Sequence, residues 1–362
     1  MTRILRMFTD LIRFTDLIFG FRSVLIGGIR DICVLWLVAL VLATVLLSSC
    51  AHHTSNIESG RKRQLIVFNA GSLAAPVADL LEEFIRLHPE ITPQQESSGS
   101  LEAARKITEL NKPCDVLAVA DYEVIPSMLI PQHAGWYVIF ARNELVLIYT
   151  SKSKFSDQIS KDNWYEILLR PGVQFGYSNP DLDPAGYRTL LHWKLAEKYY
   201  RSPGVYERLK AAVPPKNIRP KSVELVALLQ SGELDYIYCY RSIAEQNNLP
   251  FLSFPPDIDF SDDNRNDFYS TAAVEVAGSK PGERLTMKGS AIRYGLTIPE
   301  SAPDKEAAEE FVQFLLSPEG REIMKRKYLT PVTPPLADDL AKLPARLKDG
   351  VAAIGGNRGP TL

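Results

Sequence analysis

The chain has 362 residues, of which 46% are hydrophobic and 23% are charged, so it is long enough to bury a substantial core. Its 41 Lys and Arg against 43 Asp and Glu give a net charge of -2. This balance excludes a general attraction to nucleic acid or to an anionic membrane surface, so a charged ligand would need a local site.

The N-terminal region has the pattern of an export signal. Basic residues precede an apolar run, Cys33 to Leu47, that is too short for a comfortable membrane span. It ends in Leu-Ser-Ser-Cys, which resembles the bacterial lipobox and implies cleavage before Cys50 and lipidation of its thiol. We therefore expect a signal peptide over 1–49, and a lipidated Cys50 with a flexible tether over 50–62; an uncleaved anchor is the alternative.

Two cysteines, Cys114 and Cys239, remain in the body of the chain, where an oxidising compartment would allow a disulfide. Two separate, small, buried side chains are the favoured interpretation, although the sequence leaves the pairing open. Neither cysteine lies in a spacing typical of a metal or redox site, so no cofactor is expected.

From residue 64 onward, strand patterns alternate with helix patterns, which predicts an α/β protein with mostly parallel sheets. The expected strands are 65–69, 91–96, 115–120, 174–177 and 236–240, and the expected helices are 75–88, 101–110, 164–169, 186–200, 223–229 and 305–316.

Two longer strand patterns interrupt this alternation. The run 137–149 is broken by polar Arg-Asn-Glu, as expected for a strand that leaves one sheet and enters another, and 284–298 is the expected return. The prediction is a two-lobed periplasmic-binding-protein fold (type II) with two crossover strands as its hinge. Lobe 1 comprises 63–142 and 287–345, lobe 2 comprises 143–286, the Asp-rich stretch 257–267 is a solvated loop, and 346–362 is a flexible tail.

Several helix patterns open on Gly, Ser or Asp turns directly after a strand. Asn69-Ala70-Gly71-Ser72-Leu73 is the first, and comparable turns stand at 97–100, 183–188 and 222. A helix start points free backbone N–H groups outward, where an anion binds well. Helix starts that converge on one cleft would bind an oxyanion.

These segments together resemble the substrate-binding proteins of ABC importers, most closely the tungstate/molybdate-binding branch. The matching segments run in order along the body of the chain: 69–73, 99–100, 105–110, 115–116, 140–143, 183–188, 219–221, 231–236, 240–242 and 314–320.

The resemblance implies an exported, lipid-anchored monomer that captures tungstate or molybdate between its lobes and delivers it to an ABC permease. Sulfate, phosphate or another oxyanion is the alternative ligand. The residues implied to bind the oxyanion are Gly71, Ser72, Ser100, Asp183, Pro184, Ala185, Ser222 and Tyr240.

In relatives of this branch two carboxylates can approach the metal of the oxyanion, and one of them falls on Asp183. The other falls on Ser222, which cannot ligate in the same way, so six-coordinate geometry is in doubt. Glu224, two residues further on, is an alternative, although a shift of two positions at a helix start places its side chain about 200° around the axis. We interpret Ser222 instead as an N-cap whose hydroxyl or backbone N–H faces the anion.

Each of these residues also has an ordinary structural interpretation. Ser72, Ser100 and Asp183 could be helix caps, and Tyr240 a buried strand residue. Arg142, Arg188, Arg219 and Arg241 are expected to pair with carboxylates or to set the potential at the hinge rather than to touch the anion.

An enzyme and a ligand-sensing protein are the two alternatives to a transport protein. An enzyme is not expected, because the three histidines of the body stand in no nucleophile–base pattern and no phosphate-loop or metalloprotease motif occurs. A ligand-sensing pair of lobes is the remaining alternative, although no signalling domain follows in the sequence.

Overall fold

The computed structural model describes residues 63–278, 280 and 282–355. Residues from 62 onward form a compact unit of their own. The predicted signal peptide, the lipidation site Cys50 and the tether over 50–62 lie outside the described residues. None of the helices in the described part of the chain has the length and apolarity needed to cross a lipid bilayer.

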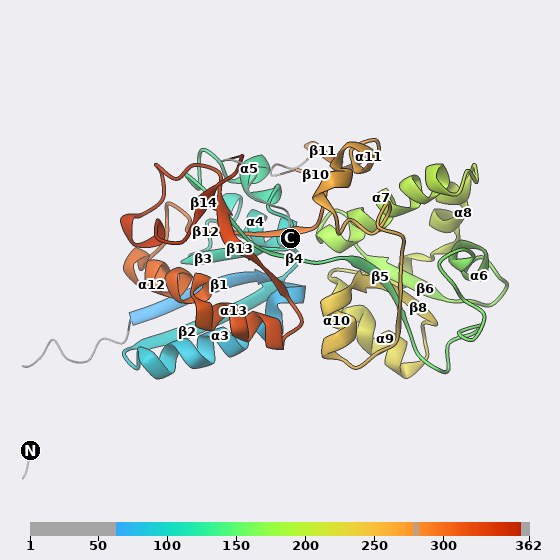
Figure 1. Ribbon diagram of the computed structural model, residues 1–362, viewed down its shortest axis with the longest axis horizontal. Helices are drawn as coiled ribbons and strands as arrows, with labels where there is room; N and C mark the ends of the chain where they lie inside the picture. The colour runs from blue at the N-terminus through green and yellow to red at the C-terminus, as the bar shows by residue number, and fades with distance from the viewer. Residues whose placement is uncertain (1–62, 279, 281, 356–362) are drawn as a thin grey trace, which may run out of the picture. The chain divides into compact units, whose positions relative to one another are not determined.

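A seven-stranded sheet, here called the first lobe's sheet, has the strand order β14-β13-β4-β12-β3-β1-β2 (Figure 1). Strand β1 is a central strand because its apolar run is buried on both faces, and it pairs in parallel with β2 and β3. The strands are β1 (Arg63–Ala70), β2 (Ile91–Ser98), β3 (Val116–Val119), β4 (Val138–Arg142), β12 (Arg293–Thr297), β13 (Thr330–Ala337) and β14 (Ala352–Ala353).

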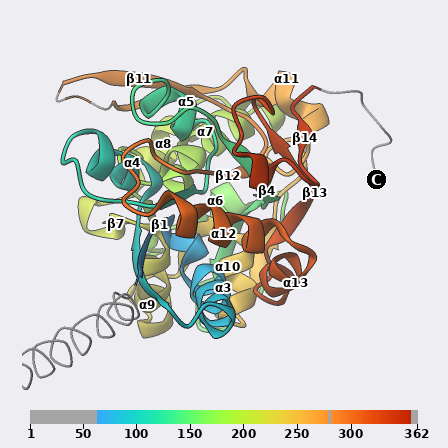
Figure 2. The same ribbon diagram turned by 90° about the vertical axis from the view of Figure 1, so that its left-hand side faces the viewer.

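Helices of the first lobe cover this sheet. Helix α3 buries one apolar stripe, and α12 and α13 pack beside it on the same side (Figure 2). The elements are η1 (Gly71–Leu73), α3 (Ala74–Leu87), α4 (Ser100–Thr108), α5 (Val124–Met128), α12 (Lys305–Leu316), α13 (Pro318–Arg326) and η5 (Ala345–Leu347).

A five-stranded sheet with the order β7-β6-β8-β5-β9 forms the second lobe. Its central strand β8 is buried along its whole length and pairs in parallel with β6. The strands are β5 (Leu145–Tyr149), β6 (Phe175–Ser178), β7 (Ile218–Arg219), β8 (Tyr236–Tyr240) and β9 (Phe251–Ser253).

Helix α7 is the core helix of the second lobe. Most of its residues are buried because β6, β8, α8 and the strand β10 pack around it. The elements are α6 (Trp164–Leu168), α7 (Pro184–Tyr199), α8 (Val205–Ala212), η2 (Pro215–Asn217), η3 (Ser222–Glu224), α9 (Leu225–Ser231), α10 (Arg241–Gln246), η4 (Asp263–Arg265) and α11 (Asn266–Tyr269).

The predicted crossing near residue 143 is confirmed. The chain leaves the first sheet at the end of β4 and enters the second sheet at β5 after two residues, Asn143 and Glu144. The predicted return strand over 284–298 is instead two strands. β11 (Arg284–Lys288) pairs with β10 (Ala273–Ala277) in a separate two-stranded sheet, and only β12 belongs to the first lobe.

Two predicted loops contain ordered structure. The middle of the 257–267 segment is core, because Ile258 and Phe260 are fully buried and the backbone of Asp259 accepts a hydrogen bond from Leu145. The predicted tail from 346 contains buried Leu347 and the paired strand β14 as far as the described residues extend. The Asp-rich composition of the first segment and the Gly-rich composition of the second predict loops. Each segment nevertheless contains apolar residues that are buried in the core.

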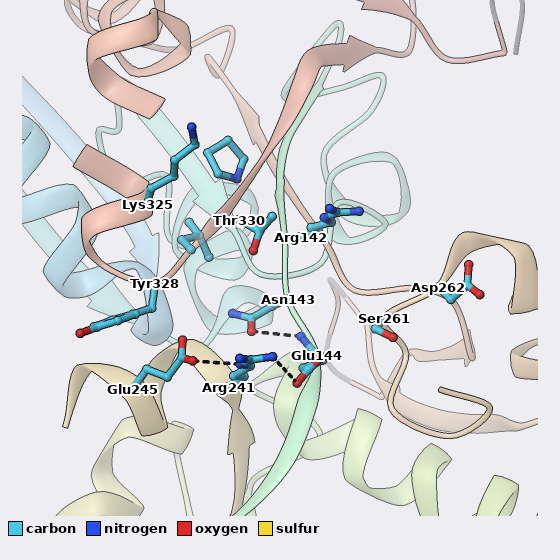
Figure 3. Close-up of a pocket in the computed structure, with 12 residues that line it drawn as sticks. Arg142, Asn143, Glu144, Arg241, Glu245, Ser261, Asp262, Lys325, Tyr328 and Thr330 are labelled. Carbon is cyan, nitrogen blue, oxygen red and sulfur yellow. Dashed lines mark hydrogen bonds and ion pairs between the residues drawn. The ribbon is translucent and has the colours of Figure 1, made fainter. Parts of the chain in front are cut away.

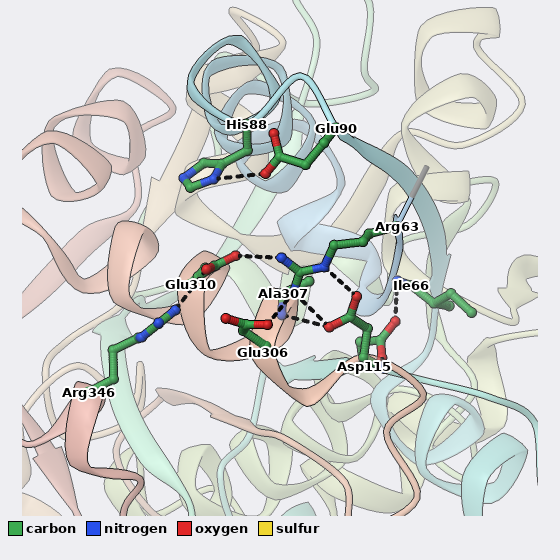
Figure 4. A network of polar contacts seen from close by, with 10 residues as sticks. Arg63, Ile66, His88, Glu90, Asp115, Glu306, Ala307, Glu310 and Arg346 are labelled. Atoms are coloured by element: carbon green, nitrogen blue, oxygen red, sulfur yellow. Dashed lines mark hydrogen bonds and ion pairs between the residues drawn. The ribbon is translucent and has the colours of Figure 1, made fainter. Parts of the chain in front are cut away.

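Polar contacts fix the start of β1 to the helices around it (Figure 4). Arg63 pairs with Asp304 at 2.8 Å and with Glu310 at 3.4 Å, and both carboxylates belong to the α12 region. Buried Asp115 accepts the backbone N–H groups of Ile66 and Asp304, each at 2.7 Å. One carboxylate thereby joins the loop before β3 to strand β1 and to the start of α12.

Replacing Asp115 by Asn should lower the free energy of unfolding by about 1–3 kcal/mol, because the amide nitrogen cannot accept the second N–H. Urea denaturation followed by circular dichroism measures this loss. The exposed Asp349→Asn variant is the control and should unfold like the wild type. Equal stability of the two variants would show that Asp115 does not join these elements.

Candidate functional site: the contact between the lobes

The predicted site residues all follow the carboxyl ends of parallel strands. In the first lobe, η1 follows β1 and α4 follows β2; in the second, α7 follows β6, η3 follows β7, and Tyr240 ends β8. Carboxyl ends of parallel strands share one edge of a sheet, which is where α/β proteins bind ligands. Each lobe therefore gathers its candidate residues at a single edge.

The two edges touch each other. The backbone N–H of Leu101, at the start of α4, donates to the carbonyl of Leu182 at 3.1 Å. A Cβ atom on Gly99 would lie 2.2 Å from that carbonyl oxygen, so only glycine allows this approach. A Cβ on Gly71 would lie 3.3 Å from the Val223 side chain, which places η1 against η3. The structure thus brings together segments that are far apart in the sequence.

Asp183 is the buried carboxylate of this region. Its Oδ2 accepts the backbone N–H of Ser222 at 2.8 Å, which ties the start of α7 to η3. Burial raises the pKa of the Asp183 carboxyl above its ordinary value, while the hydrogen bond from Ser222 acts in the opposite direction. Pro184 and Ala185 follow it as the buried first residues of α7.

The prediction that Ser222 is an N-cap is wrong. Ser222 is the first residue of η3, the N-cap position belongs to Lys221, and no side chain caps this turn. Its backbone N–H is bound by Asp183, so this group does not point at a ligand. The sequence could not show this, because the partner lies 39 residues away.

Glu224 is not a second buried carboxylate. Its side chain is 38% exposed and pairs with Lys221 at 3.8 Å, whereas Asp183 is buried. Among the described residues, no group of three or more His, Cys, Asp or Glu side chains is arranged to hold a metal ion.

Ser72 and Ser100 do not cap their own helices. Neither η1, α3 nor α4 has a side-chain cap at its N-terminus. Ser100 Oγ instead accepts the N–H of Ala120 at 3.0 Å, and Ser72 Oγ lies 3.0 Å from the hydroxyl of Tyr294. Both serines are buried, so the ordinary capping interpretation does not account for them.

An ion pair crosses between the lobes, and the sequence did not predict its carboxylate partner. Arg188 of α7 lies 2.8 Å from Asp121, which follows β3, and both side chains are at most 4% exposed. Tyr187 also donates its hydroxyl to Asp121. The available signal was the position of Asp121, directly after a buried strand. The prediction that Arg188 pairs with a carboxylate is confirmed.

Arg188 also contacts a predicted ligand residue. Its Nη1 donates to the carbonyl of Ala120 and to the hydroxyl oxygen of Tyr240, each at 2.9 Å. Burial raises the pKa of Tyr240 well above its ordinary value, so the phenol keeps its proton. With its oxygen accepting from Arg188, Tyr240 has its own O–H left to donate.

A hollow lies elsewhere, at the crossing between β4 and β5 (Figure 3). It measures about 700 Å³ and contains none of the predicted ligand residues. Arg241 lies there between Glu144 and Glu245, at 3.3 and 3.0 Å, which confirms the prediction that it pairs with carboxylates. Within the described residues, Arg142 and Arg219 form no ion pair. Cys114 and Cys239 are buried free thiols.

Residues 65–329 match the family described as bacterial extracellular solute-binding protein. The chain is 44% identical over 286 residues to a solute-binding protein of Petrotoga mobilis, covering 79% of this chain and 89% of the relative. It is 40% identical over 307 residues to the molybdate/tungstate-binding protein WtpA of Pyrococcus abyssi, covering 77% and 88%.

A solved structure supports the fold. The periplasmic molybdate-binding protein of Azotobacter vinelandii superimposes with a TM-score of 0.53 at 18% identity, covering 74% of this chain and 98% of that protein. This likeness confirms the two-lobed periplasmic-binding-protein fold that the sequence predicts.

The family and these relatives are solute-binding proteins, which confirms the prediction that the chain is not an enzyme. The matched region runs from β1 to the start of β13 and contains every predicted ligand residue. The chain belongs to the family of bacterial extracellular solute-binding proteins.

Proposed function

We propose that this protein captures tungstate or molybdate between its two lobes and delivers the oxyanion to an ABC import permease. The observation that carries the proposal is that shared neighbours link buried hydroxyl groups of the two lobes. Arg188 donates both to Tyr240 and to the carbonyl of Ala120, whose N–H donates to Ser100. The ring of Tyr240 also packs against Tyr294, whose hydroxyl lies 3.0 Å from Ser72 Oγ. Relatives 38–40% identical that are named for molybdate and tungstate support the choice of ligand.

Neutral hydrogen-bond donors suit a tetrahedral dianion. Ser100 and Tyr240 each accept a hydrogen bond through oxygen, from Ala120 and Arg188, so each keeps a proton for the ligand. Buried O–H and N–H dipoles fixed by the fold replace the water shell of the anion. Gly71, Pro184 and Ala185 would form the backbone walls of the site.

Selection among oxyanions would follow from the spacing of the hydrogen-bond donors and from the protonation of the anion. Molybdenum–oxygen and tungsten–oxygen bonds are longer than those of sulfate, so donors set apart for the larger anion bind sulfate less well. We retain Asp183 as the candidate ligand to the metal centre. With Ser222 as a neighbour and Glu224 at the surface, it would act without a second carboxylate.

The remaining parts of the proposal concern export. The sequence pattern supports a signal peptide over 1–49 and lipidation of Cys50, which would hold a monomer at the outer face of the inner membrane. The lobe boundary at 142/143 belongs to the same proposal. The boundary predicted at 286/287 lies inside β11, so the return to the first lobe comes only at β12.

Isothermal titration of residues 55–362 with tungstate, molybdate, sulfate and phosphate in turn tests the function. We expect tight binding of the first two and no heat from the others. Binding of sulfate or phosphate alone would assign the protein a different oxyanion, and no binding of any anion would favour the sensing alternative.

Replacing Ser72 or Ser100 by Ala should each weaken binding by about 1–3 kcal/mol, because a donor to a buried anion is lost. The same titration measures the effect, with exposed Ser127→Ala as the matched control. Unchanged affinity in both variants would remove these serines from the site.

Gly99→Ala should prevent the lobes from meeting, since its Cβ would collide with the Leu182 carbonyl. The backbone of Gly99 has φ -65° and ψ 147°, which alanine adopts freely, so the first lobe should still fold. We expect anion binding to weaken by about 1–3 kcal/mol and ligand-induced compaction in small-angle X-ray scattering to disappear.

The control for this variant is Gly135→Ala, where the nearest atom is the flexible carboxylate of Glu300 at 3.3 Å. If Gly99→Ala bound and compacted like this control, the approach of α4 to Leu182 would not be required for binding.

A further inference from the structure

A chain of hydrogen bonds leads from the crossing between the lobes to Ser72. Asn143, the residue directly after β4, donates from Nδ2 to the hydroxyl oxygen of Tyr294 at 3.1 Å. The Tyr294 hydroxyl lies 3.0 Å from Ser72 Oγ. Tyr294 belongs to β12 and is fully buried, and Ser72 is buried as well, so water does not compete for the contact between their hydroxyls. Asn143 is half-buried.

The orientation of the Asn143 amide is fixed by its other partners. Its Oδ1 accepts the backbone N–H groups of Glu144 and Ser242, at 3.0 and 3.4 Å. A backbone N–H can only donate, so the atom facing these two groups must be the oxygen. Figure 3 shows the contact of this oxygen with Glu144. The nitrogen then faces the hydroxyls of Ser242 and Tyr294, at 2.8 and 3.1 Å.

This orientation decides the direction of the next bond. The Asn143 nitrogen has no lone pair to offer, so the proton of Tyr294 cannot go to Asn143. Burial raises the pKa of Tyr294, so the phenol keeps this proton. Leaving a buried O–H without an acceptor is unfavourable, and Ser72 Oγ is the acceptor within reach. Tyr294 therefore donates to Ser72.

We propose that Asn143 is a positioning residue that makes Ser72 a hydrogen-bond donor to the bound anion. Because Ser72 Oγ accepts from Tyr294, the Ser72 proton is directed away from Tyr294 and toward the ligand. This inference rests on the proposed oxyanion function. It adds Asn143 as the residue that determines whether Ser72 donates or accepts a hydrogen bond at the site. Asn143 also joins Tyr294 of the first lobe to Ser242 at the start of α10 in the second, so the hinge and the ligand donor share one amide.

Asn143→Asp is the informative substitution because it reverses the direction of the hydrogen bonds from residue 143 to Ser72 while the shape of the side chain stays the same. A carboxylate accepts the Tyr294 proton, Tyr294 oxygen then accepts from Ser72, and Ser72 presents lone pairs to the anion. We expect molybdate binding to weaken at least as much as in Ser72→Ala, by about tenfold or more.

A double-mutant cycle separates this reversal from the added negative charge. In a Tyr294→Phe background no phenol can be reversed, so Asn143→Asp should weaken binding several-fold less than in the wild type. The charge effect is present in both backgrounds. Equal losses in the two backgrounds would overturn the proposal, and Asn111→Asp, an exposed site in the first lobe, controls for the substitution itself.

A second comparison does not depend on the folding of Asn143→Asp. Tyr294→Phe should weaken molybdate binding less than Ser72→Ala, because Ser72 keeps its own proton for the anion. A larger loss of affinity in Tyr294→Phe than in Ser72→Ala would mean that Ser72 acts through Tyr294. That result would refute the proposed direction of the hydrogen bonds. The wild type is titrated first with all four oxyanions. Absence of all binding refutes the proposed function together with this inference, whereas wild-type binding with an additive cycle refutes the inference alone.

Discussion

Arg188 and Asp121 form an ion pair that is almost completely removed from water, and it joins the two lobes. Burying two charges is unfavourable unless their remaining hydrogen-bonding groups are also satisfied. Here Tyr187 donates to Asp121, and Arg188 Nη1 donates to the Ala120 carbonyl and to Tyr240, whereas Nη2 lies 2.8 Å from Asp121 and has no hydrogen-bond partner among the described residues. The ion pair therefore places the end of β3, the first turns of α7 and the end of β8 in one arrangement.

The polar groups around this ion pair have one feature in common, which is that each accepts a hydrogen bond from another group of the protein. Ser100 accepts from Ala120, and Tyr240 accepts from Arg188, so each hydroxyl oxygen already has a donor from the protein. Each hydroxyl therefore keeps its own proton to donate to a ligand. A site built on this plan is selective for acceptors, and an oxyanion offers acceptors on every side.

Hydrophobic periodicity and turn chemistry predicted much of the fold from the sequence. The strand 65–69, the helix 305–316 and the passage between sheets near Asn143 are local patterns, and the structure has all three. The short elements α5, α8 and β7 and the division of 284–298 into β11 and β12 were not predicted. Their formation depends on neighbours in the fold rather than on the composition of the segment.

The site shows the same limit. The positions of the candidate residues at the ends of strands could be predicted from the sequence, because strand direction alone places them at one edge of a sheet. These residues are Gly71, Ser72, Ser100, Asp183 and Tyr240. The sequence could not give the partners of their side chains. The bond between Asp183 and Ser222 and the pairing of Arg188 with Asp121 join residues 39 and 67 positions apart, and no local pattern encodes such pairs.

The contact between Leu182 and the start of α4 has a consequence for how related sequences should vary. Leu182 contributes its carbonyl oxygen, and Leu101 contributes its backbone N–H, so neither side chain takes part in the bond. Evolution can exchange both side chains without losing this contact. The requirement appears at Gly99 alone, where a missing Cβ makes room for the carbonyl. Among descendants of a common ancestor that close in the same way, glycine should persist at this position while the partners that it accommodates drift.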